Sequence, residues 1–438
     1  MRFVSTRGGE EVSFREAIFA GLAPNGGLYV PAGSLDLRGL FASFNRGTAF
    51  RQIAAEVSLR LLADELGSRE IERIVEGAFG FTPTLRSLGD GRHLLELFHG
   101  PTAAFKDFGA SFLAAVMEEF LGQEKRRALI LVATSGDTGG AVARAFFRKR
   151  NIRVVILYPS GRVSSLQEQQ LTTLGENITA LEVRGSFDDC QRLVKQAFMD
   201  PVLKRDLALT SANSINLGRL IPQSYYYIYA WAQLRSGPGE RVIFCVPSGN
   251  FGNLTAGVYS WQWGLPVSAF IAATNRNDVV PRYLASGRFR PRPSRRTLSN
   301  AMDVGNPSNF ERLAALFRQD SRAMAALIRG ERVTDRQTRR MIRKAYLRDG
   351  VVVDPHTAVG LEAVERLQRR SPRGADPIVI LATAHPGKFR EIVEPQTRRS
   401  VELPETLRES QELPKRSVPI GATFEELAAF LRRGYSCL

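Results

Sequence analysis

The sequence has little cysteine and no long apolar run. Its three cysteines, Cys190, Cys245 and Cys437, lack the spacing of metal ligands, and their odd number argues against a disulfide framework. No apolar run approaches the roughly 18 to 20 residues that a membrane-spanning helix needs. The N-terminal residues carry charges of both signs and no apolar segment, unlike a secretory signal. We therefore expect a cytoplasmic protein with no membrane partner and no metal site.

Acidic residues are also few, since 44 of them face 60 basic residues and leave a net charge of +16. The stretches 276–296 and 329–349 carry much of this excess. In the second, Arg332, Arg336 and Arg340 recur at helical spacing, which predicts a solvated helix face as well as it predicts phosphate binding. No zinc-finger spacing or RNA-binding aromatic motif accompanies them. We expect no nucleic-acid partner, although a basic field would attract a small anionic substrate.

Lysine is scarce too, with eight lysines against fifty-two arginines. Lys106 lies between Phe105 and Phe108 in "HGPTAAFKDFG" (99–109). An arginine keeps its proton in a protein, whereas a lysine can become a neutral nucleophile or base. Burial among phenylalanines would lower the pKa of Lys106, and so would the start of a helix predicted over 107–121. Lys106 is either a surface lysine or the covalent anchor of an aldehyde cofactor.

Beyond residue 88, short apolar runs typical of buried parallel strands alternate with helical stretches. This alternation predicts an α/β fold, and two clusters of strands indicate two lobes. The predicted strands are 127–133, 153–158, 178–183, 207–210, 241–246, 267–274 and 377–384, and the predicted helices are 138–150, 164–175, 187–198, 217–235 and 423–434. We expect an N-terminal domain over 1–88, a two-lobed core over 89–400, and a tail with a helix over 401–438.

Four polar loops follow predicted strands at their carboxyl ends, where open α/β sheets bind ligands. These loops are "TSGDTGG" (134–140), "NSIN" (213–216), "PSGNFGN" (247–253) and "TAHP" (383–386). Gly249 and Gly252 would let backbone amides approach a phosphate at a helix start, although an ordinary helix cap is an equal alternative. "TSGDTGG" is either a helix cap or a carboxylate-binding loop. A lysine amine together with a phosphate cradle is what pyridoxal 5′-phosphate requires.

The motifs "HGPTAAFKDFG", "ATSGDTGGAVA", "SANSINLGRL", "VPSGNFGNLTAG" and "TAHPGKF" together resemble the threonine synthases, a family of fold-type II pyridoxal-phosphate enzymes. The likeness runs in order from about residue 3 to about residue 395, and includes a segment similar to the N-terminal domain of that family. The resemblance implies a two-lobed α/β fold like that of the tryptophan synthase β chain. It also implies mainly parallel sheets and a small N-terminal domain.

The resemblance further assigns residues to the cofactor. These are Lys106, Gly249, Asn250, Phe251, Gly252 and Thr383. Lys106 would form an imine with the aldehyde of pyridoxal phosphate and act as the catalytic base. The 249–252 loop would hold the cofactor phosphate, and Thr383 would hydrogen-bond to the pyridine nitrogen.

Other residues are assigned by the same resemblance to the substrate, O-phospho-L-homoserine. These are Ser135, Gly136, Asp137, Thr138, Asn213 and Arg219. The 135–138 loop would bind the α-carboxylate, although many fold-type II relatives have asparagine in place of Asp137. Asn213 and Arg219 would bind the phosphate, which suits the bidentate fork of an arginine.

The reaction implied is that of threonine synthase, the last step of threonine biosynthesis. A γ-elimination followed by a β-addition converts O-phospho-L-homoserine and water into L-threonine and phosphate. A phospho-lyase that releases 2-oxobutyrate is the nearest alternative, because it would use Lys106 and the same loops. A non-catalytic binding protein is a second alternative, against which the retained Lys106 and both glycine loops argue. We expect a monomer or a homodimer.

Overall fold

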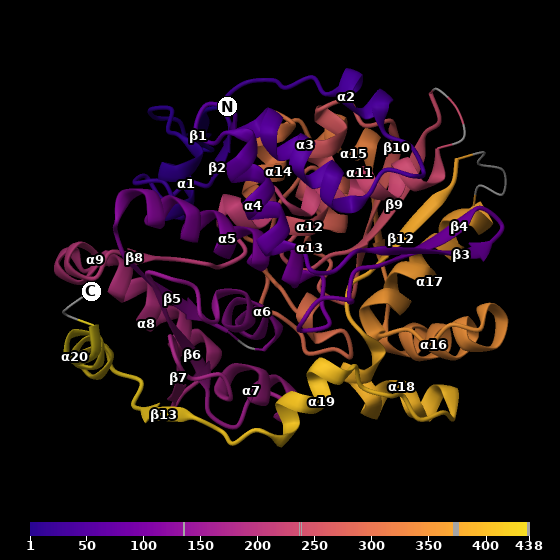
Figure 1. The fold of residues 1–438 in the computed structure, drawn as a ribbon. Helices are drawn as coiled ribbons and strands as arrows, with labels where there is room; N and C mark the ends of the chain where they lie inside the picture. The colour runs from indigo at the N-terminus through magenta and orange to yellow at the C-terminus, as the bar shows by residue number, and fades with distance from the viewer. Residues whose placement is uncertain (135, 236, 238, 371–375, 436–438) are drawn as a thin grey trace.

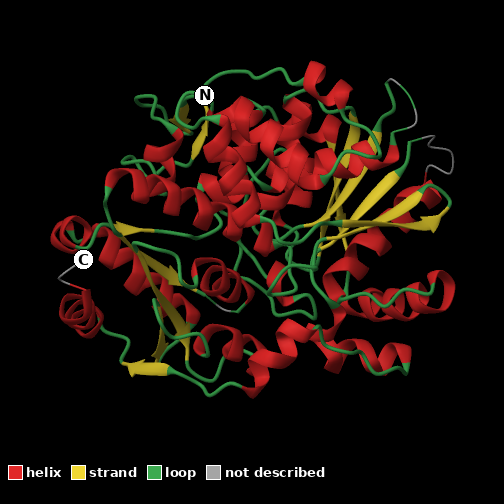
Figure 2. Cartoon of the chain, viewed as in Figure 1, coloured by secondary structure: helices red, strands yellow, loops and turns green. Residues whose placement is uncertain are grey.

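Two mainly parallel β-sheets form the framework of the protein, and helices cover both (Figures 1 and 2). The computed structural model describes residues 1–134, 136–235, 237, 239–370 and 376–435. The six-stranded sheet, in spatial order, contains β11 (Ile328–Arg332), β10 (Val267–Thr274), β9 (Val242–Pro247), β12 (Ile378–Ala382), β4 (Arg92–Glu96) and β3 (Thr84–Gly89). The five-stranded sheet contains β13 (Ser417–Ile420), β7 (Ile178–Val183), β6 (Ile152–Pro159), β5 (Ala128–Ala133) and β8 (Leu209–Thr210). Neighbouring strands are parallel, except that β3 is antiparallel to β4.

Helices connect these strands and build the N-terminal region. That region contains the antiparallel pair β1 (Phe3–Ser5) and β2 (Tyr29–Pro31), with α1 (Phe14–Ala20), α2 (Arg38–Ser43), α3 (Phe50–Leu62) and α4 (Ser68–Ala78). The helices that follow are α5 (Lys106–Glu124), α6 (Asp137–Phe146), α7 (Ser165–Thr172), α8 (Phe187–Met199), α9 (Pro201–Asp206), α10 (Leu217–Leu220), α11 (Gln223–Leu234), α12 (Gly252–Gln262) and α13 (Val279–Ser286). The last are the 3₁₀ turn η1 (Asn300–Met302), α14 (Phe310–Leu316), α15 (Ser321–Leu327), α16 (Asp335–Asp349), α17 (Pro355–Arg370), the 3₁₀ turn η2 (Pro386–Phe389), α18 (Arg390–Thr397), α19 (Glu405–Glu412) and α20 (Phe424–Tyr435).

The predicted α/β architecture with two lobes is confirmed. Each predicted strand overlaps an observed strand, and its ends lie within three residues of the observed ends. The predicted strand 267–274 coincides with β10. Every residue of β5 and of β12 is buried. Apolar runs of this kind predict parallel strands well, because such strands are covered on both faces.

The single helix predicted over 217–235 is wrong. The chain instead forms α10 and α11, which are separated at Ile221 and Pro222. Proline lacks the amide hydrogen that a continuous helix needs, and its ring clashes with the preceding turn. Pro222 therefore precedes the first turn of α11, where its missing donor costs nothing.

The predicted helical face that included Arg332 is wrong at that residue. Arg332 ends β11, and α16 begins only at Asp335. The Thr334 amide donates to the Gln337 side chain (2.9 Å), and this capping box sets the start of the helix. The other arginines of the predicted face, Arg336, Arg339, Arg340 and Arg343, lie on α16 as predicted.

The C-terminal segment links the two lobes along one edge of the molecule, where it is the yellow part of Figure 1. It leaves α18 beside α16 and reaches the other lobe, where β13 pairs with β7. Lys415 bonds to Glu168 and Glu182 there, each at 2.7 Å. Helix α20 matches the helix predicted over 423–434, whereas β13 and α19 were not predicted.

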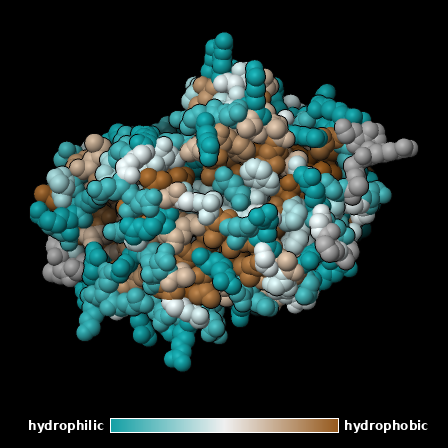
Figure 3. Space-filling view, turned by 90° about the horizontal axis from the view of Figure 1, so that it is seen from above, coloured by the Kyte–Doolittle hydropathy of each residue, from teal (hydrophilic) through white to brown (hydrophobic). Residues whose placement is uncertain are grey.

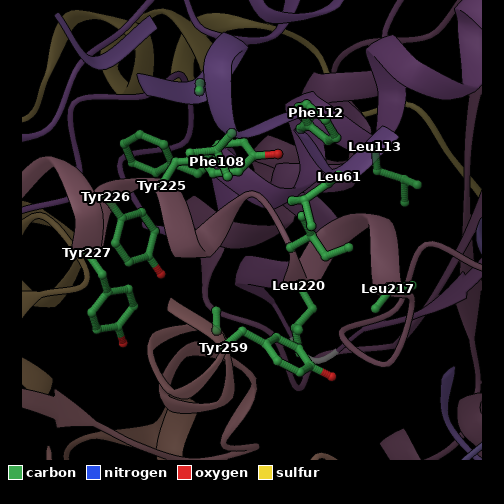
Figure 4. Close-up of a cluster of buried hydrophobic side chains, with 14 of the residues drawn as sticks. Leu61, Phe108, Phe112, Leu113, Leu217, Leu220, Tyr225, Tyr226, Tyr227 and Tyr259 are labelled. Carbon is green, nitrogen blue, oxygen red and sulfur yellow. The ribbon is translucent and has the colours of Figure 1, made fainter. Parts of the chain in front are cut away.

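Aromatic side chains from the N-terminal region and from the core pack in one buried cluster. Figure 4 shows part of it, including Phe108 and Tyr225. Phe79, which follows α4, contacts the rings of Phe50 (5.1 Å between centroids) and Phe108 (6.1 Å). Because Phe108 lies one turn from the start of α5, this cluster fixes the beginning of that helix.

The surface is mixed in polarity. Figure 3 shows polar side chains over much of the face seen from above, with apolar ones between them. Within the described residues, no helix has both the length and the apolar character that would be needed to cross a membrane.

Replacing Phe79 by alanine should strongly destabilise the protein. The fully buried ring leaves a cavity between the N-terminal region and α5, which costs about 3–5 kcal/mol. Urea unfolding should show a lower midpoint for Phe79→Ala. The control Leu347→Ala removes a side chain that is 69% exposed and should stay within about 0.5 kcal/mol of the parent. Equal midpoints for the two variants would contradict the packing described.

Candidate active site

Lys106 lies where the two lobes face each other, at the first residue of α5. Its side chain is 17% exposed, and its Nζ is 3.6 Å from Oδ2 of Asp137. Asp137 begins α6, directly after the carboxyl end of β5. The structure therefore brings the predicted lysine and the predicted "TSGDTGG" loop together.

Burial and neighbouring charges together set the pKa values of both side chains of this pair. Burial acts most strongly on Lys106 and lowers its pKa, and nearby Lys388 and Arg219 lower it further, while Asp137 works against them. Burial alone would raise the pKa of Asp137, but the cations of Lys388 and Lys106 outweigh burial and hold this pKa well below its usual range. The site thus favours an ionised carboxylate beside an amine that loses its proton readily.

Asp107 stabilises the loop before Lys106 through its hydrogen bonds with Thr102. Its carboxylate accepts hydrogen bonds from the amide and the hydroxyl of Thr102, at 2.9 and 2.5 Å. Burial raises the pKa of Asp107 to about 6, and the bonds from Thr102 oppose that shift. Asp107 therefore shapes the loop, while Lys106 faces the site.

The "TAHP" loop lies against this same segment. The Phe105 amide donates to the carbonyl oxygen of Thr383 at 2.9 Å, and Ala104 bridges to Ala384. Thr383 is buried immediately after β12. These backbone contacts place Thr383 against the segment that leads to Lys106.

The "PSGNFGN" loop forms a tight turn into α12. Phe251 has a left-handed backbone (φ 62°), and α12 begins at Gly252 with the unpaired amides of a helix start. A Cβ at Gly249 would lie 2.8 Å from the carbonyl oxygen of Ala301, so this position requires glycine. The Asn250 side chain donates to Ser214 Oγ (3.3 Å), which joins the loop to "NSIN". Two of the predicted loops therefore meet here.

The "TSGDTGG" loop also depends on a glycine. Gly136 has φ 146°, and a Cβ there would collide with the side chain of Gln167. Gln167 donates to Oδ1 of Asp137 at 3.0 Å, which holds this carboxylate from α7. Thr138 is half-buried in the first turn of α6. Ser135 lies outside the described residues.

Arg219 is a buried cation with an unused donor. Its residue is 3% exposed, and Nη1 donates to the Ala212 carbonyl at 2.7 Å. Its buried Nε has no partner in the described parts of the chain. Burial lowers the pKa of Arg219 to about 10, so it stays charged at neutral pH. A buried guanidinium of this kind fits an anionic ligand.

Asn213, the other predicted ligand of the substrate phosphate, is half-buried. Its backbone carbonyl accepts a hydrogen bond from the Asn216 amide (3.0 Å).

These residues fit pyridoxal 5′-phosphate. Lys106 would supply the amine for its aldehyde, the 249–252 turn would supply backbone amides for its phosphate, and Thr383 would supply a buried hydroxyl. A phosphate at the start of α12 would meet the positive end of that helix.

Two buried cations near the site were not predicted. Lys388, in η2, has its Nζ 2.7 Å from Oδ1 of Asp137. Arg312 is fully buried and donates to the carbonyls of Tyr29 (2.9 Å) and Ile215 (2.6 Å). Lys388 is one of only eight lysines and follows "TAHP", a signal that could have singled it out. Nothing in the sequence marks Arg312 among fifty-two arginines.

Three further polar residues in the family-like segments have structural roles. Burial lowers the pKa of His385 to about 4, and its Nδ1 accepts from the Gly387 amide (3.1 Å). His99 contacts Glu96 at 2.9 Å. Asp303 accepts hydrogen bonds from Asn275, Asn277 and Thr297. Each of these side chains is therefore engaged by a neighbouring segment of the chain.

Known proteins resemble this chain along its length. The family model described as "Pyridoxal-phosphate dependent enzyme" matches residues 75–384, and the models "Threonine synthase N terminus" and "Threonine synthase, C-terminal" match 2–79 and 357–431. The threonine synthase of Serratia marcescens is 42% identical over 96% of this chain and 96% of its own length. That of Escherichia coli is 41% identical over 95% and 96%. The chain belongs to the threonine synthase family.

Solved structures of threonine synthases share the fold. The pyridoxal-phosphate-bound threonine synthase from Brucella melitensis is 35% identical, covers all of both chains, and has a TM-score of 0.92. The Escherichia coli threonine synthase is 40% identical, covers 99% of this chain and 100% of its own, and has a TM-score of 0.90. The threonine synthase resemblance and the fold-type II assignment are therefore confirmed, and the cofactor of this family member is pyridoxal phosphate.

Replacing Gly249 by alanine should weaken cofactor binding at least roughly tenfold, which corresponds to about 1.4 kcal/mol. The new methyl group would press on the backbone of Ala301 and Met302, so the turn must move. Titration of cofactor-free protein with pyridoxal phosphate measures the dissociation constant. Gly33→Ala is the control, because a Cβ there meets no atom within 4 Å. An unchanged constant in Gly249→Ala would exclude this turn from the cofactor site.

Proposed function

We propose that this chain is a threonine synthase, which converts O-phospho-L-homoserine and water into L-threonine and phosphate. The observation that carries the proposal is one buried site with two different functions. Lys106 offers a readily deprotonated amine beside Asp137, and Arg219 offers a buried guanidinium whose Nε has no partner among the described residues. The amine suits the aldehyde cofactor of the family, and the guanidinium suits a phosphorylated substrate.

The proposed cofactor site contains Lys106, Gly249, Asn250, Phe251, Gly252 and Thr383. The proposed substrate site contains Ser135, Gly136, Asp137, Thr138, Asn213 and Arg219. Contacts between these loops support both assignments: Lys106 approaches Asp137, the Phe105 amide donates to Thr383, and Asn250 donates to Ser214.

When bound, pyridoxal phosphate withdraws electrons from the substrate and makes its C–H bonds acidic. The Lys106 amine can then remove the proton at Cα and move protons at Cβ and Cγ, because its unbranched side chain reaches adjacent carbons. Arg219 would hold the phosphate and stabilise its charge as the Cγ–O bond breaks. The low exposure of Lys106 and Asp137 limits the access of bulk water to this chemistry.

Other properties follow as proposals. We propose a small N-terminal domain over 1–88, a two-lobed core over 89–400 and a tail over 401–438. We further propose a cytoplasmic enzyme that acts as a monomer or homodimer and has no nucleic-acid or membrane partner. The alternative phospho-lyase, which would release 2-oxobutyrate, is not favoured by the relatives described above.

Proton NMR of the reaction products tests the proposed function directly. Purified protein mixed with O-phospho-L-homoserine should form L-threonine and an equal amount of phosphate. Lys106→Ala should form neither, because it lacks the amine that anchors the cofactor and moves the protons. 2-Oxobutyrate as the main product would instead assign a phospho-lyase.

Replacing Arg219 by glutamine should raise the KM for O-phospho-L-homoserine about 10- to 100-fold. The loss of a hydrogen bond to a charged group, worth about 1.5–3 kcal/mol, produces a change of this size. Initial rates of phosphate release give the KM, and the visible absorbance checks that the cofactor content is unchanged. Arg322→Gln, at an exposed arginine, is the control. An unchanged KM in Arg219→Gln would remove this arginine from the substrate site.

A further inference from the structure

A second lysine, Lys388, lies in the site and has no part in the reaction proposed above. Its side chain is 1% exposed, and its Nζ is 2.7 Å from Oδ1 of Asp137. Lys106 approaches the other oxygen of the same carboxylate, Oδ2, at 3.6 Å. Asp137 is therefore shared between two of the eight lysines of the chain.

The Lys388–Asp137 pair joins the two lobes. Lys388 follows β12 of the six-stranded sheet, whereas Asp137 follows β5 of the five-stranded sheet. Lys388 also donates to the Thr102 carbonyl at 3.1 Å, in the loop that leads to Lys106. With Gln167 bound to the same oxygen of Asp137, the carboxylate is held from three sides.

The charged groups around Lys106 come from four elements. They are Asp137 on α6, Lys388 on η2, Arg219 on α10, and Asp107 next to it on α5. Asp107 is engaged by Thr102, so Asp137 is the anion that faces the amine. Burial of Lys106 favours its neutral form, and the positive charges of Lys388 and Arg219 add to that effect.

We propose that Lys388 is a positioning residue of the proposed threonine synthase, which pairs with Asp137 so that this carboxylate stays fixed and does not hold a proton on Lys106. Without Lys388, the cation nearest to Asp137 would be Lys106 itself. The carboxylate would then stabilise the protonated amine, which can neither react with the cofactor aldehyde nor accept a proton from the substrate. The inference rests on the proposed role of Lys106 as cofactor anchor and base.

Cofactor uptake tests the proposal without any turnover. The full-length protein, freed of cofactor, is mixed with pyridoxal phosphate, and the rate at which visible absorbance appears is measured against pH. The rate requires neutral Lys106, so its pH midpoint follows the pKa of that amine. Lys388→Met should raise the midpoint by about one pH unit, and slow uptake about tenfold below it.

Three further variants separate charge from shape. Lys388→Arg keeps the cation and should keep the midpoint close to that of the parent. Lys388→Met combined with Asp137→Asn removes both charges and should return the midpoint toward the parent value. Lys204→Met, at an exposed lysine, should change nothing. If Lys388→Met fails to fold, as judged by circular dichroism, Lys388→Gln provides the same comparison.

A midpoint that is unchanged in a folded Lys388→Met or Lys388→Gln protein would overturn the proposal. So would a raised midpoint that the second substitution at Asp137 does not lower. Failure of the proposed function is recognised separately: the parent protein would take up the cofactor with a measurable midpoint yet form no threonine. If threonine forms and the midpoint does not move, only the role of Lys388 fails.

Discussion

The active site depends on one buried carboxylate, Asp137, and on the cations that surround it. Burying an isolated ion away from water costs free energy, and an oppositely charged partner at good geometry offsets that cost. Lys388 supplies that pairing from η2, and Lys106 on α5 approaches the other oxygen of the same carboxylate. Because Lys388 follows β12 and Asp137 follows β5, the carboxyl ends of the two sheets must face each other for this ion pair to form. Fold and chemistry are linked through this interaction.

Arg312 is another buried cation, and it connects three segments of the chain. It has carbonyl and amide oxygens as its hydrogen-bond acceptors: Tyr29 O, Ile215 O and Asn309 Oδ1. These acceptors come from the N-terminal region, the 213–216 loop and the residue before α14. The Asn309 amide in turn donates to the Asn250 carbonyl at 3.2 Å. The N-terminal region thus contacts, through Arg312, the 213–216 loop and the residue that bonds to Asn250, in the loops that we propose bind the two phosphates.

The C-terminal segment completes this arrangement from the opposite edge (Figure 1). Leu403 and Leu407 pack with Ala103, in the loop that leads to Lys106, and with Leu166 of α7. The segment then adds β13 to the five-stranded sheet. A polar stretch with prolines gives no periodic signal for such a strand, because a four-residue edge strand is defined by its partner. Its sequence therefore predicted a tail, whereas its contacts make it a strap across both lobes.

The sequence by itself determined the strands, the loops after them and the unusual lysine. Buried parallel strands are continuous apolar runs, and parallel strands place the loops at their carboxyl ends on one edge, so both features can be read locally. Lys106 stood out because arginine supplies nearly all other positive charge. Only the tertiary structure decided the partners of Asp137 and the burial of Arg219 and Arg312. The Lys388–Asp137 pair joins residues 251 apart in the sequence, and the Arg312–Tyr29 hydrogen bond joins residues 283 apart, and no local pattern encodes such separations.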